Sequence, residues 1–156
     1  MRLSMAGEYA VRCMLYLSAQ GEGTVASRRE VAQAMGIPEQ FLAKIAQQLS
    51  RAGVLQILQG PRGGYRLPRD PRQLTLLEVV EASAGEIFLN DCVIKPGCCR
   101  RAEHCSVHNV WQKARTQLRD TLRKATFASL LRQESCLLAH PRRLREKHPG
   151  IVGKNL

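Results

Sequence analysis

The most reactive side chains of the sequence gather in one short segment. Four of the six cysteines lie between residues 92 and 105, and two of the four histidines stand beside them. Packing gains little from four thiols in a segment that also carries glycine and proline, whereas a soft metal centre needs thiolates brought together by flexible chain. The segment therefore predicts metal or redox chemistry. The cysteines are Cys92, Cys98, Cys99 and Cys105, with His104 and His108 beside them.

The cysteine spacing leaves several chemistries open. Five residues separate Cys92 from Cys98, and five separate Cys99 from Cys105, so the spacing does not choose between the two adjacent cysteines. A zinc ribbon normally offers two close Cys-x-x-Cys pairs and a thioredoxin-type site offers one, and the segment has neither. We therefore favour an iron–sulfur cluster, with a thiol or disulfide sensor and a zinc site as the alternatives.

The overall composition limits what kind of protein carries this segment. A chain of 156 residues has room for one ordinary domain, or for a small module with a dimerisation arm, but not for the two large lobes of a multidomain enzyme. Its net charge of +11 attracts polyanions. The sequence has no apolar run of transmembrane length and no signal peptide, so we expect a cytoplasmic protein whose thiols stay reduced. Cys13 and Cys136 are expected to be buried small hydrophobes.

Residues 1–72 are predicted to form a winged helix-turn-helix domain. Ser4 and Ser27 suit the caps of helices, and Ser27 with Glu30 has the spacing of a capping box. Pro38 suits the first position of a third helix, because its missing N–H would be unpaired there anyway. A glycine-rich tip then joins two short apolar runs. The predicted elements are helices over 5–19, 28–35 and 38–51, and strands over 54–58 and 64–67.

The remaining residues are predicted to form a sensor arm. Residues 73–91 form a connecting segment with a net charge of −4, whose helix begins at a capping box made by Thr75 and Glu78. The cysteine-rich loop follows over residues 92–108. Residues 106–135 then form a long dimerisation helix and a short following helix, while the basic tail, 136–156, is expected to be loosely ordered.

The long helix carries an apolar seam close to a coiled-coil repeat, which we expect to pair with a second copy of the chain. The whole therefore predicts a mainly α fold with a small β-hairpin wing, in which a winged helix-turn-helix is joined to a long dimerisation helix. The seam residues are Trp111, Ala114, Leu118, Leu122 and Ala125.

The third predicted helix is expected to read duplex DNA. Its apolar residues Phe41, Leu42, Ile45 and Leu49 recur at helical spacing and are expected to face the core, which leaves a polar face for the major groove. An arginine at the glycine-flanked hairpin tip suits the minor groove. The predicted DNA-contacting residues are Arg2, Arg28, Arg29, Pro38, Glu39, Gln40, Lys44, Gln47, Gln48, Arg51, Arg62, Gly63 and Arg66.

Several separate motifs resemble the family of IscR- and NsrR-type bacterial regulators, over about residues 1–135. The resemblance implies a homodimeric winged-helix transcription factor that binds palindromic promoter DNA. In cluster-bearing members it also implies sensing of iron–sulfur status, oxidants or nitric oxide. The motifs are Met1-Arg-Leu-Ser4 with Tyr9-Ala10, the wing Gly60-Pro-Arg-Gly-Gly-Tyr65, the helix Leu74-Thr75-Leu-Leu-Glu78, and Cys92 followed by Cys105-Ser-Val-His108 and Trp111.

The same resemblance implies a ligand set. Three cysteines of the loop bind the cluster in such members, which here implies Cys92, Cys105 and one of the adjacent pair. We favour Cys99 over Cys98 because it keeps the spacing to Cys105. The extra adjacent cysteine departs from the family pattern, and it leaves open both the cluster type, [2Fe–2S] or [4Fe–4S], and a cluster-free member that senses through one of these two thiols.

The fourth ligand varies among the members of that family. His108 matches the histidine that follows the last cysteine in IscR-like proteins, and imidazole is an established ligand of iron–sulfur clusters. Glu8 stands where some members take a carboxylate from the first helix, in some cases from the partner subunit. We favour His108 over Glu8.

The sequence thus predicts a non-enzymatic regulator of bacterial promoters, located on the nucleoid when bound to DNA, whose DNA affinity is switched by a cluster in the 92–108 loop. The main alternative is a cluster-free, thiol-based redox regulator. A small thiol oxidoreductase is less favoured, because adjacent cysteines such as Cys98 and Cys99 form a strained disulfide. A basic RNA-binding protein is also less favoured, because the modules that stack RNA bases need exposed aromatic residues on a sheet, and Tyr65 is expected to pack the wing instead.

Overall fold

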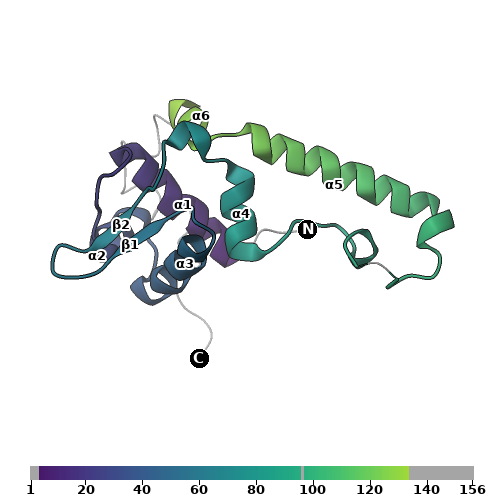
Figure 1. Ribbon diagram of the computed structural model, residues 1–156, viewed down its shortest axis with the longest axis horizontal. Coiled ribbons are helices and arrows are strands. Elements are labelled where there is room, and N and C mark those ends of the chain that lie inside the picture. The colour runs from purple at the N-terminus through teal and green to yellow at the C-terminus, as the bar shows by residue number, and fades with distance from the viewer. Residues whose placement is uncertain (1–3, 96, 134–156) are drawn as a thin grey trace.

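The computed structural model describes residues 4–95 and 97–133, so Arg2 and the predicted tail lie outside the described residues. It is mainly helical with a single two-stranded antiparallel hairpin in this part of the chain (Figure 1), which confirms the predicted fold class. The elements are α1 (Met5–Gln20), α2 (Arg28–Met35), α3 (Glu39–Arg51), β1 (Gln56–Leu58), β2 (Gly64–Arg66), η1 (Pro71–Gln73), α4 (Leu76–Ala84), η2 (Asp91–Val93), η3 (Ala102–His104), α5 (Ser106–Lys124) and α6 (Phe127–Gln133).

The first helices begin at the predicted caps. The Ser4 hydroxyl accepts a hydrogen bond from the backbone N–H of Gly7, and the Ser27 hydroxyl accepts one from Glu30. The predicted capping box at Ser27 is only half formed, because the Glu30 carboxylate accepts instead from the Tyr16 hydroxyl, at 2.8 Å. Pro38 is the N-cap of α3 rather than its first helical residue, with an extended backbone at ψ 131°.

The core of the N-terminal module forms around α1. Cys13 and Met14 of α1 are fully buried, as are Leu42 and Leu49 of α3. Burial raises the pKa of the Cys13 thiol to about 12, which fits its predicted role as a small hydrophobe. The prediction that Phe41 faces this core is wrong. Its side chain is 57% exposed, because it lies on the flank of α3 next to α1 rather than on the buried stripe.

The wing is shorter than predicted, since Val54 and Leu55 are buried ahead of β1 and only three residues of each strand pair. Tyr65 of β2 is buried and its backbone forms a bridge to Ala26, so it packs the wing against the helices as predicted. A Cβ atom at Gly64 would lie 2.2 Å from the carbonyl oxygen of Ala26. Only glycine permits this close approach.

The capping box at the start of α4 is complete. Thr75 and Glu78 exchange hydrogen bonds between side chain and backbone, and the predicted helix ends at Ala84 as expected. The helix α5 begins at the end of the molecule away from the wing and runs back towards the start of α4 (Figure 1). The next helix, α6, begins there with Phe127, which is fully buried in the core. The free end of α5 and the wing therefore lie at opposite ends of the molecule. No helix in the described ranges has the length and hydropathy needed to cross a membrane.

Candidate functional site

The first candidate surface is the outer face of α3. The residues buried in the core lie along one side of this helix, so the polar residues between them point away from the protein. Their side chains are all exposed, as DNA contact requires. They are Gln40, Lys44, Gln47, Gln48 and Arg51.

The starts of α2 and α3 lie next to each other, and a basic side chain of α2 pairs with an acidic side chain of α3. The Arg28 guanidinium lies 3.4 Å from the Glu39 carboxylate, an ion pair that the sequence did not reveal. Arg29 and Pro38 are exposed in the same region. Arg28 has Glu39 as its ion-pair partner, whereas Arg29 has no carboxylate partner among the described residues.

The wing presents one arginine at its tip and directs another along its strands. Arg62 is exposed between glycines. A Cβ atom at Gly63 would lie 2.3 Å from the carbonyl oxygen of Leu58, so the tight tip excludes any side chain there. The Nε atom of Arg66 donates to the side-chain oxygen of Gln56 at 2.9 Å, which holds this guanidinium against the neighbouring strand. Arg62 is thus the better placed of the two to enter a groove.

The second candidate surface is the cysteine loop, which includes η2 and η3 and meets the start of α5. Cys92 and Cys105 are half-buried, whereas Cys98 and Cys99 are exposed. The Nδ1 atom of His108 lies 3.4 Å from the Sγ atom of Cys92. Partial desolvation, followed by the charges of the three other loop cysteines, raises the pKa of the Cys92 thiol. The loop therefore places one of its thiols against an imidazole.

The remaining candidate ligands are more widely spaced. Within residues 4–95 and 97–133, no three Cys, His, Asp or Glu side chains converge closely enough to hold a metal ion. Glu8 lies on α1, where its carboxylate is 3.9 Å from the guanidinium of Arg12. Of the two candidates for the fourth ligand, His108 contacts a loop cysteine and Glu8 has an arginine as its ion-pair partner.

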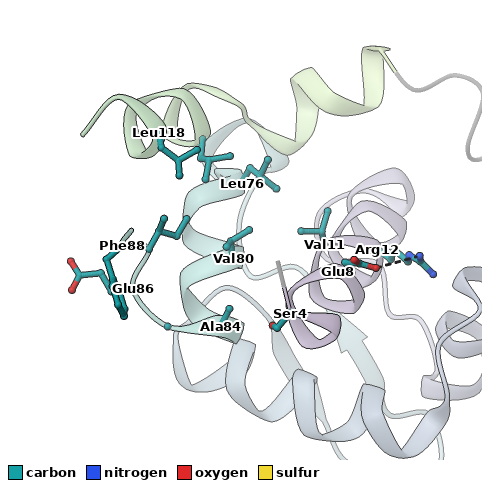
Figure 2. A pocket seen from close by; sticks show the side chains of 13 residues that line it. Ser4, Glu8, Val11, Arg12, Leu76, Val80, Ala84, Glu86, Phe88 and Leu118 are labelled. Atoms are coloured by element: carbon teal, nitrogen blue, oxygen red, sulfur yellow. Dashed lines mark ion pairs between the residues drawn. The ribbon is translucent and has the colours of Figure 1, made fainter. Parts of the chain in front are cut away.

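A groove is lined by residues of α1, α4 and α5 (Figure 2). Its volume is about 710 Å³, and its walls are mainly apolar, with Val11 on one side and Leu76 and Val80 on the other. Leu118 and Leu122 of α5 line it and also pack against the small cluster of buried residues on α4. Two members of the predicted dimerisation seam are thus partly covered by their own chain.

The rest of the seam has a different environment. Trp111 and Ala114 are half-buried, and Val110 is 60% exposed on the same helix. Ala125 lies just beyond the end of α5, where its carbonyl accepts from the backbone N–H of Leu76 at 2.8 Å. This hydrogen bond anchors the chain to α4, so Ala125 does not continue the helical seam as predicted.

An ion-pair cluster that sequence reasoning missed ties the acidic connecting segment to α5. Arg119 pairs with the carboxylate of Glu81, while Arg115 pairs with Glu86 and donates from Nε to the carbonyl oxygen of Ile87 at 3.0 Å. The same Glu81 carboxylate accepts from the backbone N–H of Ile87, at 3.0 Å. The net charge of −4 in residues 73–91, together with the strongly basic long helix, is the signal in the sequence from which this contact could have been predicted.

Comparison with known proteins extends these observations. Residues 3–133 match the Rrf2 family, described as "Iron-dependent Transcriptional regulator". The chain is 33% identical to the protein aau3 of Rhizobium meliloti, a match that covers 85% of this chain and 86% of that protein. It is 28% identical to the HTH-type transcriptional regulator IscR of Cronobacter sakazakii, with 95% and 91% covered. The structure of CymR, the global cysteine regulator of B. subtilis, has the same fold, with a TM-score of 0.69 at 21% identity over 86% of this chain and 99% of CymR.

Proposed function

Because the chain belongs to the Rrf2 family of transcriptional regulators, and is therefore a DNA-binding regulator, we propose that it acts as a homodimer whose DNA affinity depends on an iron–sulfur cluster in the 92–108 loop. The contact between His108 Nδ1 and Cys92 Sγ carries the cluster proposal. It joins the imidazole to the thiol-rich loop at the start of α5, the helix that we assign to dimerisation.

The DNA-reading part of the proposal rests on α3 and the wing. The exposed face of α3, from Gln40 to Arg51, has the donors and acceptors that read base edges in the major groove. Arg62 at the wing tip suits a narrow minor groove, which concentrates negative potential. The cations around these elements contact phosphates and set the register of the protein on the duplex.

The dimer part of the proposal rests on α5 and the groove beside it. The end of α5 nearer the cysteine loop has apolar surface that the described chain leaves exposed, because Val107 is 52% exposed and Val110 is 60% exposed beside the half-buried Trp111. A second copy related by a two-fold axis buries that surface and places two α3 helices about 34 Å apart, one turn of DNA. Two-fold symmetry of the protein calls for an inverted-repeat operator.

The donor set of the loop fits an iron–sulfur cluster. Cys92, Cys105 and one of Cys98 and Cys99 supply thiolates, and His108 supplies an imidazole from the first turn of α5. When bound, such a cluster supplies a redox-active and oxidant-labile centre. The chain's own part is to draw the two exposed cysteines towards the half-buried pair, which orders the loop at the end of the dimerisation helix.

The loop is mechanically connected to the reading heads. Cys92 comes five residues after Ile87. The arginines of α5 hold Glu86 and Ile87 beside α4, which packs on both α1 and α3. A coupling free energy of about 1 to 3 kcal/mol between the loop and DNA changes the affinity several-fold to over a hundredfold, which is enough for a switch.

The test is to purify the full chain without oxygen, count iron and sulfide, and measure binding to an inverted-repeat duplex at fixed salt. The proposal expects iron and sulfide in the protein, with a DNA affinity that changes when the metal is removed. The double variant Cys92→Ala, Cys105→Ala should lack iron and no longer respond. Protein that carries no iron or sulfide, with DNA binding unaffected by the double variant, contradicts the cluster proposal.

A second candidate is a cluster-free regulator that senses oxidants through thiols. The exposure of Cys98 and Cys99 favours it, because both thiols are accessible to a peroxide. Two thiols and one hydrogen peroxide then give one disulfide and two water molecules. Because a bond between adjacent cysteines is strained, we expect the disulfide to join one of them to another cysteine.

This candidate is separated from the first by mass spectrometry. Treatment of metal-free protein with hydrogen peroxide should produce a disulfide and a change in DNA affinity that dithiothreitol reverses. The variant Cys98→Ser, Cys99→Ser should show neither effect, whereas Cys13→Ser keeps both because Cys13 is buried. Peroxide treatment that leaves DNA affinity unchanged rules out the thiol sensor.

A further inference from the structure

Phe41 is the one large apolar side chain of α3 that the fold leaves in water, with 57% of its surface exposed. It lies in the first turn of the helix, between the exposed Gln40 and the buried Leu42. In helix-turn-helix proteins the first residues of the recognition helix are the ones that meet base edges. The side chain therefore stands where contact with DNA is expected, although its type suggests a core residue.

Other side chains hold the phenyl ring on its inner side only. The Tyr9 ring of α1 lies 6.4 Å from the Phe41 ring, centroid to centroid, at an interplanar angle of 57°. The guanidinium of Arg12 covers Tyr9 in turn, 5.7 Å from its ring centroid. This tilted aromatic contact lies on the α1 side of Phe41, and more than half of the Phe41 side chain stays exposed. Burial of apolar area is favourable, so a phenyl ring that served only the core would gain stability from a deeper position.

We propose that Phe41 contacts the C5-methyl group of a thymine in the major groove and so selects that base, an inference that rests on the proposed DNA binding. The methyl group of thymine is the apolar feature that the major groove displays, and phenylalanine is among the side chains suited to contact it. Gln40 and Lys44, one residue before and three after, supply hydrogen bonds and charge that set the register beside it.

The experiment uses the full-length protein and a duplex enriched from a random pool by that protein. Each thymine of the duplex is replaced in turn by deoxyuridine, which removes only the methyl group, and the dissociation constant is measured by fluorescence anisotropy at fixed salt. Loss of one buried methyl contact should weaken wild-type binding about fourfold at one position in each half-site, and about fifteenfold when both positions are replaced. Phe41→Ala should bind the enriched duplex and its deoxyuridine-substituted forms with the same affinity.

Two further variants control the experiment. Phe41→Leu keeps apolar surface at the site and should keep part of the methyl sensitivity. Val25→Ala removes exposed apolar surface outside α3 and should keep all of it. Since Phe41 is exposed, the variants should fold, which circular dichroism verifies.

The outcomes separate this inference from the function on which it rests. If no duplex is enriched, the proposed DNA binding has failed. If a duplex is enriched but deoxyuridine weakens the wild type and Phe41→Ala equally, the thymine contact is wrong and the phenyl ring serves only to pack on Tyr9. The same holds if no single position is sensitive to the methyl group.

Discussion

At the scale of single residues, the structure separates candidates that the sequence could only place side by side. His104 and His108 both flank Cys105 in the chain, but only His108 contacts a thiol, because it stands on the first turn of α5 facing Cys92. His104 ends the short helix η3 and is exposed. The distinction depends on how the loop folds back on the helix, which cysteine spacing does not encode.

This distinction gives a prediction with a matched control. His108→Ala should lower the affinity of the anaerobically prepared protein for iron by at least about tenfold, because a ligand beside Cys92 is lost. His104→Ala removes an imidazole from the same segment and should leave iron content and the visible absorption spectrum unchanged. Iron and sulfide counts with absorption spectroscopy provide the measurement. Equal losses in the two variants would argue against a ligand role for His108.

At the scale of elements, the joint between the reading module and the sensor arm depends on the start of α4. The Glu78 carboxylate accepts hydrogen bonds from the backbone N–H and the hydroxyl of Thr75, and it also pairs with Arg69 at 2.6 Å. Leu76, the next residue after Thr75, donates to the carbonyl of Ala125, so the same turn also holds the return of α5. A capping box that looks local in the sequence therefore connects the start of α4, the chain at Arg69 and the chain at Ala125 after α5.

The carboxylate at this joint predicts a pH dependence. Partial burial raises the pKa of Glu78, but the hydrogen bonds from Thr75 and Arg69 outweigh it and hold the pKa below its ordinary value of 4.5. A lowered folded-state pKa contributes stability that is present above 4.5 and is lost as the pH falls through the folded-state value. The free energy of unfolding in urea should therefore decrease more steeply below that pH for the wild type than for Glu78→Gln.

Two comparisons define the outcome of this titration. At pH 7 the Glu78→Gln variant should be less stable by about 1 kcal/mol, the usual contribution of a cap. Glu22→Gln changes an exposed carboxylate in the loop after α1 and should keep the wild-type acid profile. If Glu78→Gln follows the same acid profile as the wild type, its carboxylate contributes no pH-dependent stability.

At the scale of the whole molecule, a single chain leaves apolar surface of α5 exposed. The long helix α5 extends away from the reading module, and within the described residues none of its side chains is fully buried (Figure 1). Leu118 and Leu122 are partly covered by α4, whereas Val107 and Val110, nearer the cysteine loop, are more than half exposed. A second copy is the natural occupant, because the same apolar seam is available on both chains.

The dimer proposal predicts a change in assembly. Trp111→Asp should raise the dimer dissociation constant by about thirtyfold or more, since buried tryptophans at interfaces commonly contribute 2 kcal/mol or more. Gln112→Asp adds the same charge at the neighbouring exposed position and should have a much smaller effect. Sedimentation velocity over a concentration series measures both. A Trp111→Asp protein that dimerises like Gln112→Asp would show that the seam is not the interface.

Most features that could be predicted from the sequence depend on interactions between residues close together in the chain. Caps at Ser4 and Thr75, the glycine-rich wing tip and the spacing of apolar residues determine where elements begin and end, because the interactions involved span only a few residues. The same local rules grouped the four loop cysteines and the polar face of α3.

Only the tertiary structure decided what depends on distant neighbours. The Glu30 carboxylate accepts a hydrogen bond from Tyr16 and does not complete the capping box. The exposed Phe41 ring contacts Tyr9, and Arg28 forms an ion pair with Glu39. In each case the two partners lie on different helices, so the contact depends on how the helices pack. The sequence by itself determined a winged helix-turn-helix with a polar third helix and a thiol-rich segment, while the tertiary structure decided which imidazole contacts a thiol and which side chains of α3 remain exposed.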